Sequence, residues 1–308
     1  MTAQALRLGT RRSALALAQS GLVARAVTEA TGRRVELVEI TTHGDVSREA
    51  LTQIGGTGVF VNALRDALLD GSVDFAVHSL KDLPTADPAG LALAAVPERE
   101  DVRDVLVARE QLKFADLSPG ARVGTGSPRR AAQLRLLRQD LEIVPVRGNV
   151  DTRVGYVAKG ELDAVVLAYA GLSRLGRLGE VTDYFDPNAL LPAPGQGALA
   201  LECRAADGAL AAQLAALDHG PTRAAVRAER ALLAALEAGC SAPVGGYATA
   251  TADELQLTGT VTEADTPDAP RSIRMSVTGA PGEAERLGRE LAARMLDQGA
   301  AGLMGKKT

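Results

Sequence analysis

The feature that most restricts the fold is an alternation of short apolar strands with helical patterns. Apolar runs of strand length occupy 6–9, 35–40 and 74–79, and helical periodicity covers 13–30 and 60–70 between them. Strands that alternate with helices in this way form largely parallel sheets covered by helices. The start of the chain therefore predicts an α/β domain.

A second alternation begins near residue 103. It predicts strands at 104–108, 121–124, 143–146 and 163–168, and helices at 128–138 and 149–159. A Pro/Gly-rich segment at 191–197 ends this unit, and the apolar run 198–203 after it can return to the first sheet. We therefore expect a discontinuous domain 1 (1–97 and 198–216) and a domain 2 (98–197).

The pattern changes again toward the C-terminus, where strands no longer alternate with helices. A helix is expected at 222–237, strands near 246–250, 254–260 and 271–278, and a last helix at 283–298. This order is typical of a small α+β domain, which we place at 217–308. The predicted fold class is thus α/β: two similar periplasmic-binding-protein-like α/β domains facing a cleft, plus a small α+β C-terminal domain.

Composition excludes several classes of protein. The chain has 308 residues and a formal net charge of −4, with 3% aromatic residues and no Trp, which disfavours nucleic-acid binding. No apolar run has the length of a signal peptide or a membrane span, so we expect a cytoplasmic protein. The two cysteines suggest neither a disulfide scaffold nor a metal site.

Candidate ligand groups in the first domain stand where predicted strands end. Arg11 and Ser13 follow the first strand at the start of a helix, and Lys81 and Asp82 follow the third. Ligands of open α/β sheets bind at the carboxyl ends of strands. The alternative for each residue is a solvated surface ion pair. We take His78, inside the strand pattern, as a packed or hydrogen-bonded residue.

The second domain repeats this arrangement three times. A strand leads through Thr125 and Ser127 to a helix that begins with Pro128, but the segment lacks the phosphate-loop lysine, so a carboxylate ligand fits better than a nucleotide. The strand-to-helix turns of this domain carry five arginines, namely Arg129, Arg130, Arg147, Arg153 and Arg174. Gathered at one edge of a sheet, they predict a polyanionic ligand, and we expect them to serve that ligand rather than the fold. Surface salt bridges remain the alternative for any single arginine.

Seven motifs occur in the order seen in porphobilinogen deaminases. They are Arg11 with Ser13, Val-His-Ser-x-Lys-Asp-x-Pro, Gly-Thr-x-Ser-x-Arg-Arg, Arg-Gly-Asn-Val-x-Thr-Arg, Ala-Gly-Leu-x-Arg, Pro-Gly-Gln-Gly and Gly-Cys-x-x-Pro. The chain resembles this family over nearly its whole length. The resemblance implies a transferase, hydroxymethylbilane synthase, which condenses four porphobilinogen units, with release of ammonia, into the linear tetrapyrrole hydroxymethylbilane.

The resemblance also implies a cofactor and its ligands. A dipyrromethane would be bound covalently, through a thioether, to Cys240, whereas Cys203 lies in an apolar strand and is expected to pack. Asp82 would be the catalytic carboxylate. Besides Cys240, the implied cofactor ligands are Ser13, Lys81, Asp82, Thr125, Ser127, Arg129, Arg130, Arg147 and Gly148. The implied substrate ligands are Arg11, Ser13, Arg147, Arg153, Arg174 and Gln196. No metal is implied; the protein would be a monomer that passes its product to uroporphyrinogen-III synthase.

Some positions depart from the family pattern. Gln53, Thr57, Asn62 and Ala63 stand where charged residues are common in relatives, and Gly126 and Pro128 replace a usual Ser and Leu. The long Gly-rich segment 41–58 is expected to be a mobile lid. A noncatalytic anion-binding module would also explain the arginines, but it leaves the Cys240 segment without a role.

Overall fold

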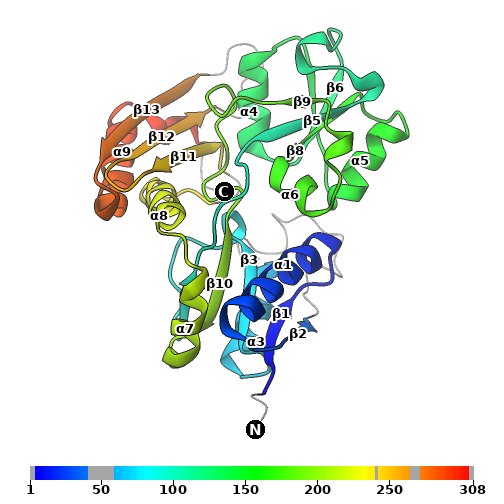
Figure 1. Cartoon of the computed structure of the whole chain (residues 1–308). Coiled ribbons are helices and arrows are strands. Elements are labelled where there is room, and N and C mark those ends of the chain that lie inside the picture. Colours follow the sequence, from blue (N-terminus) through cyan, green and yellow to red (C-terminus); the bar gives the residue numbers. More distant parts are fainter. Residues whose placement is uncertain (1–3, 41–58, 240–241, 264–270, 305–308) are drawn as a thin grey trace. The chain divides into compact units, whose positions relative to one another are not determined.

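The computed structural model (Figure 1) describes most of the chain. The described residues are 4–40, 59–239, 242–263 and 271–304. They form two compact units, one of Met1–Arg99 with Ala198–Arg223 and one of Glu100–Gly197 with Ala224–Thr308. No helix in these described ranges is both long and apolar enough to cross a membrane.

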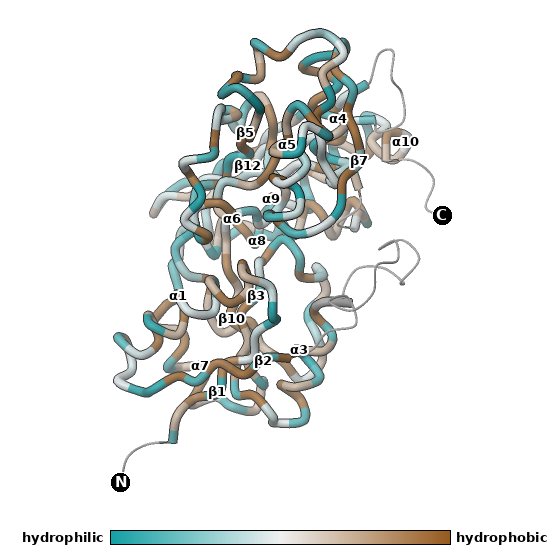
Figure 2. Tube along the Cα trace, turned by 90° about the vertical axis from the view of Figure 1, so that its right-hand side faces the viewer, coloured by the Kyte–Doolittle hydropathy of each residue, from teal (hydrophilic) through white to brown (hydrophobic). Residues whose placement is uncertain are grey.

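The first unit is built on a five-stranded sheet in the order β2-β1-β3-β10-β4. Its strands are β1 (Leu6–Thr10), β2 (Val35–Glu39), β3 (Phe75–Ser79), β4 (Leu91–Ala95) and β10 (Leu199–Arg204). Its helices are α1 (Ala14–Thr31), α3 (Val59–Leu69) and α7 (Gly208–Leu214). β1 runs parallel to β2 and β3, whereas β10 runs antiparallel to β3 and β4. The predicted return of the chain to the first sheet is confirmed. Figure 2 shows the apolar character of β10, whose first five residues are buried.

Helix α1 illustrates why the sequence folds as it does here. The Ser13 hydroxyl accepts a hydrogen bond from the Ala16 N–H at 3.3 Å and so caps the first turn. At the other end Gly32 has φ 68°, a left-handed conformation that ends the helix without a Cβ clash, and its N–H donates to the Thr28 carbonyl. Both ends agree with the prediction.

The second unit contains another five-stranded sheet, in the order β7-β6-β8-β5-β9. Its strands are β5 (Asp104–Ala108), β6 (Arg122–Thr125), β7 (Glu142–Pro145), β8 (Ala164–Ala168) and β9 (Asp183–Tyr184). Its helices are α4 (Pro128–Leu137), α5 (Val150–Ala158) and α6 (Tyr169–Arg174). One face packs with α4 and the other with α5 and α6. β5 is antiparallel to β8, so it begins at the edge where β6, β7 and β8 end, with Asp104 opposite Ala168.

The C-terminal part of this unit is a three-stranded antiparallel sheet backed by helices. It comprises α8 (Gly220–Ala235), β11 (Val244–Ala250), β12 (Leu255–Thr262), β13 (Ser272–Gly279), α9 (Ala284–Asp297) and α10 (Ala300–Leu303). One core, centred on Leu232, Leu257 and Leu291, joins α8 and α9 to one face of the sheet. The predicted α/β class, with two similar domains and a smaller α+β domain, is confirmed.

Candidate functional site

The strand-to-helix turn after β6 is closed by two side chains. The Ser127 N–H donates to the Thr125 hydroxyl at 3.2 Å, and the Ser127 hydroxyl caps α4 by accepting from the Arg130 N–H at 3.4 Å. Pro128 occupies the first turn of the helix, where its missing N–H costs nothing. This local chemistry fixes where Arg129 and Arg130 leave the helix.

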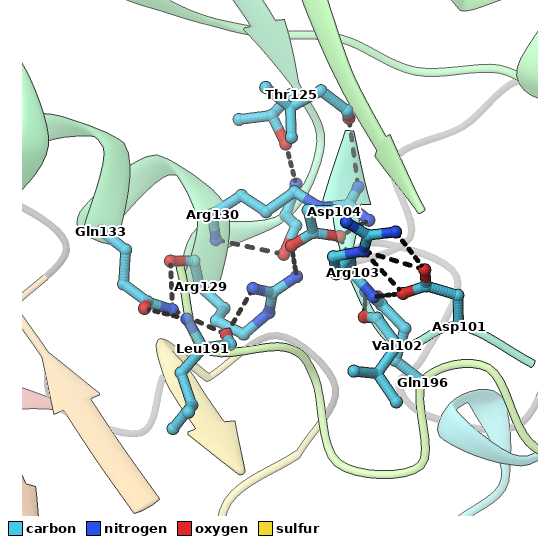
Figure 3. A network of polar contacts seen from close by, with 12 residues as sticks. Asp101, Val102, Arg103, Asp104, Thr125, Arg129, Arg130, Gln133, Leu191 and Gln196 are labelled. Carbon is cyan, nitrogen blue, oxygen red and sulfur yellow. Dashed lines mark hydrogen bonds and ion pairs between the residues drawn. The ribbon is translucent and has the colours of Figure 1, made fainter. Parts of the chain in front are cut away.

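Both arginines turn toward Asp104 at the start of β5 (Figure 3). Arg129 Nη2 lies 2.7 Å from Asp104 Oδ2, and Arg130 Nη2 lies 2.8 Å from Asp104 Oδ1. Their remaining terminal nitrogens donate to the Leu191 and Val166 carbonyls at 2.6 and 3.2 Å. Each guanidinium is therefore held by one carboxylate oxygen and one backbone carbonyl.

This ion-pair cluster is buried. Asp104 has no exposed surface, and Arg129 and Arg130 are 3% and 5% exposed. Burial alone would raise the pKa of Asp104, but the two guanidiniums outweigh it and hold that pKa below its usual range. Arg129 and Arg130 therefore also serve the fold, and their binding of a ligand stays a prediction. The physical reason is that Asp104, far away in sequence, needs positive partners once it is buried.

Arg153 has a different environment at the same edge of the sheet. Its Nε is buried and forms no hydrogen bond within the described residues. Burial lowers its pKa, and the nearby charge of Arg130 lowers it further. A buried guanidinium nitrogen without an acceptor, beside a second cation, is a favourable place for an anion.

The backbone at this edge requires glycine at two positions. A Cβ on Gly126 would lie 2.4 Å from the Val146 carbonyl oxygen, so no larger residue fits there. Gly148 has φ 103°, in the region that favours glycine, and follows the exposed Arg147.

Arg174 and Gln196 complete the predicted set in this unit. Arg174 Nη2 donates to the Gly197 carbonyl at 2.6 Å, and its pKa is lowered by burial although Glu100 opposes this. Gln196, 1% exposed, donates through Nε2 to Asp104 Oδ1 at 2.8 Å and to the Val102 carbonyl at 2.7 Å. The structure therefore brings Gln196 together with the Asp104 cluster.

In the first unit, the predicted residues share one edge of the first sheet because β1 and β3 are parallel. Arg11 and Ser13 follow β1, and Lys81 and Asp82 lie in a 3-10 turn that directly follows β3. Asp82 is exposed, whereas Arg11, Ser13 and Lys81 are half-buried. Exposure leaves the carboxylate of Asp82 accessible to a ligand.

His78 is buried, as predicted, and its partner is an acid on β10. Its Nε2 lies 3.2 Å from Oε2 of Glu202. Arg65 also donates to this carboxylate, from Nε to Oε2 at 3.0 Å and from Nη2 to Oε1 at 2.7 Å. Burial opposes ionisation of Glu202, but His78 and Arg65 lower its pKa to about 2. The neighbouring Cys203 is fully buried in the apolar core, which raises its pKa and confirms it as a packing residue.

Three predictions fall on residues outside the described ranges. They concern Cys240, the segment 41–58, and its members Gln53 and Thr57. Of the other unusual positions, Asn62 is exposed and Ala63 half-buried on α3. Among the described residues there is no group of three or more His, Cys, Asp or Glu side chains arranged to hold a metal ion.

Two acids that organise the second unit were missed from the sequence: Asp104, and Glu229 on α8, neither of which has any exposed surface. The signal for Asp104 was an acid that opens a continuous apolar strand. Glu229 gave no such signal, because it stands between arginines on an amphipathic helix and its position looks like part of the solvated face.

Comparison with known proteins agrees with these observations. Residues 6–212 match the family model "Porphobilinogen deaminase, dipyromethane cofactor binding domain", and residues 223–297 match "Porphobilinogen deaminase, C-terminal domain". Porphobilinogen deaminase 1 of Streptomyces coelicolor is 63% identical, covering 100% of this chain and 99% of that protein. The porphobilinogen deaminase of Thermobifida fusca is 62% identical, covering 97% of this chain and 96% of that protein. Among solved structures, the methionine-binding protein MetQ has 11% identity and a TM-score of 0.44, covering 68% of this chain and 88% of that one. With two family models matched along nearly its full length and relatives above 60% identity, this chain belongs to the porphobilinogen deaminase family.

Proposed function

We propose that the protein is a hydroxymethylbilane synthase, a transferase that joins four porphobilinogen units head to tail on a covalent dipyrromethane primer. Each addition breaks the aminomethyl C–N bond of one porphobilinogen, releases ammonia, and forms a C–C bond to the free α-carbon of the growing chain. No oxidant or reductant is consumed. The match of residues 6–212 to the cofactor-binding domain carries this proposal.

The cofactor would supply the nucleophilic pyrrole carbon and the anchor for the chain. Its acetate and propionate groups suit the arginine edge of the second sheet, where Arg153 has a buried Nε without a hydrogen-bond partner among the described residues. Arg147 is exposed at the next turn, beside Gly148. We assign carboxylate binding to these groups together with Ser127, Thr125 and the half-buried Arg174.

We assign to Arg129, Arg130 and Gln196 a more limited contact with the ligand. Their terminal nitrogens already donate to Asp104 and to backbone carbonyls. They would act mainly through their positive charge and by fixing the edge from which the other groups project. From the first domain, Arg11, Ser13 and Lys81 would bind further carboxylates.

Asp82 is the proposed catalytic group. As ammonia leaves porphobilinogen, positive charge spreads over the pyrrole, and a fixed carboxylate that accepts from the pyrrole N–H stabilises that charge. The turn directly after β3 presents Asp82 in an exposed position, which supports this role. The protein supplies no nucleophile during elongation.

Intact-mass spectrometry of the freshly purified protein tests the proposal. The wild type should be heavier than its sequence by one dipyrromethane, Cys240→Ser should lose this adduct, and Cys203→Ser should keep it because Cys203 is buried in the core. A fully active wild type without added mass would refute the covalent cofactor.

The remaining assignments rest on the same proposal. We place the discontinuous domain 1 at 1–97 and 198–216, domain 2 at 98–197 and domain 3 at 217–308. The enzyme would work in the cytoplasm as a monomer and release its unstable product to uroporphyrinogen-III synthase. Sedimentation of the purified protein would test the monomer.

A further inference from the structure

A buried segment without regular structure follows the second sheet in the chain, leads to β10 and contacts the C-terminal domain. It comprises residues 191–197 (Leu-Pro-Ala-Pro-Gly-Gln-Gly), which we call the strap, and all of them except Ala193 are buried. Buried backbone outside helices and strands needs partners for its N–H and C=O groups. The partners of the strap come from two different parts of the second unit.

On one side the strap is fixed to the arginine edge of the second sheet (Figure 3). The Leu191 carbonyl accepts from Arg129 at 2.6 Å and from Gln133 at 3.0 Å, and Gln133 Oε1 accepts from the Leu191 N–H at 2.8 Å. Near the other end, Gln196 donates to Asp104. The strap is therefore hydrogen-bonded to the Asp104 cluster near both of its ends.

On the other side the strap is held by the C-terminal domain. Glu229, in the middle of α8, accepts from the Gly195 N–H through Oε2 at 2.6 Å and from the Ala248 N–H on β11 through Oε1 at 2.8 Å. The Gly246 N–H also donates to the Pro192 carbonyl at 2.9 Å. One buried carboxylate thus joins a helix, a strand and the strap.

The approach of β11 to the strap is close enough to require glycine. A Cβ on Gly245 would lie 2.9 Å from Thr260 Cγ2 on β12, 3.0 Å from the Leu191 carbonyl oxygen and 3.1 Å from the Leu191 Cβ. Any side chain at this position must displace the strap, the sheet or both.

We propose that the strap fixes the position of the C-terminal domain relative to the arginine edge of the second sheet. Glu229 is the positioning residue that holds the strap in place. The physical connection runs from Glu229 through Gly195 and Gln196 to Asp104 and its two arginines. This inference rests on the proposed function, because α8 and β11 are the elements on either side of the segment that contains Cys240. Displacing a reacting group by about 1 Å can slow a reaction about a hundredfold. A segment that only positions the two parts can therefore control the rate without touching substrate.

Two variants disturb the strap from different directions, and each has a matched control. Glu229→Gln replaces one of the two carboxylate acceptors by an amide donor, and Gly245→Ala pushes on Leu191. Leu291→Ala opens the core of the same domain, and Gly279→Ala presses a methyl group on Leu287 in that core from β13, which does not pair with β11.

The measurements are intact mass and single-turnover rates of each porphobilinogen addition, at a temperature where circular dichroism shows every variant folded. We expect Glu229→Gln and Gly245→Ala to carry the dipyrromethane mass but to elongate at least about tenfold more slowly, with KM changed less than about twofold. The controls should elongate at the wild-type rate despite an equal or greater loss of melting temperature.

The positioning role would be overturned if Gly245→Ala elongated at the wild-type rate. It would also be overturned if the controls elongated more slowly in proportion to their loss of melting temperature. If Glu229→Gln does not fold, Gly245→Ala decides alone. Failure of the proposed function itself would look different, because the wild type would then lack the added mass.

Discussion

Two aspartates, each at the edge of an α/β sheet where parallel strands end, have opposite environments. Asp82 follows a strand of the first sheet and is exposed. Asp104 opens a strand of the second and is fully buried beneath two guanidiniums and an amide. An exposed carboxylate is free to meet a ligand, whereas a buried and fully paired one is committed to the architecture.

The arginines divide in the same way. All three have a buried Nε without an acceptor among the described residues, but Arg129 and Arg130 form ion pairs with Asp104, whereas no described carboxylate pairs with Arg153. Charge at a sheet edge therefore indicates ligand binding only after the internal ion pairs have been accounted for.

The largest expected effect is on stability, for Asp104→Asn. Removing the charge leaves two buried guanidiniums without a counter-ion, which should lower the free energy of unfolding by about 3–5 kcal/mol, measured by urea denaturation. Asp101→Asn is the control, since its ion pair with Arg103 is partly exposed and should contribute less than about 1 kcal/mol. Equal losses in the two variants would remove the distinction between buried and exposed acids.

The loss of unfolding free energy at acid pH should depend on Glu202. Because its pKa is lowered to about 2, its ionised form stabilises the fold by about 3 kcal/mol at neutral pH; this contribution is complete above the ordinary carboxyl pKa and disappears as pH falls toward 2. Urea denaturation at several pH values should show that the free energy of unfolding falls less steeply with decreasing pH in Glu202→Gln than in the wild type. The exposed Glu142→Gln should behave as wild type, and an unchanged pH dependence in Glu202→Gln would contradict the assignment.

For Asp82→Asn we expect the opposite pattern. With preassembled cofactor the variant should keep its adduct and change stability by under about 1 kcal/mol, yet elongate at least about a hundredfold more slowly, because the carboxylate charge opposite the developing cation is lost. Single-turnover assays would measure this. The exposed Asp87→Asn in the same connection is the control, and near-normal elongation by Asp82→Asn would exclude it from the mechanism.

The smallest expected effect is the change in unfolding free energy that Arg153→Leu causes in the cofactor-free protein. No described carboxylate pairs with this arginine, and its removal relieves repulsion with Arg130, so the free energy of unfolding should shift by less than about 1 kcal/mol. Thermal unfolding of the cofactor-free protein would measure it, with Arg130→Leu expected to lose several kcal/mol. If both variants unfold alike, Arg153 is structural too.

Much of the fold was predictable because the apolar periodicity is strong. Strand 104–108 was placed without error, and most long helices ended within two residues of their predicted limits. The missed elements give weak signals: β9 has two residues, α10 has four, α6 has six, α7 has seven, and the Leu-Ala-Leu-Ala-Ala run of β4 lacks β-branched side chains.

The site was predictable only where it depends on local chemistry. Pro128 lies in the first turn of α4, as the sequence predicted. Asp104 lies 25 residues before Arg129 and 92 residues before Gln196, and both pairings depend on the antiparallel placement of β5. Spacing along the chain carries no information about such contacts.

Strand β10 has a consequence for the order in which the protein matures on the ribosome. It lies between β3 and β4, so residues 75–79 and 91–95 have no strand between them until residues 199–204 have emerged. All strands of the second sheet emerge earlier, and their sheet can close while the first still presents open edges that are prone to aggregation. We therefore expect the domain that is synthesised first to be the second to finish folding.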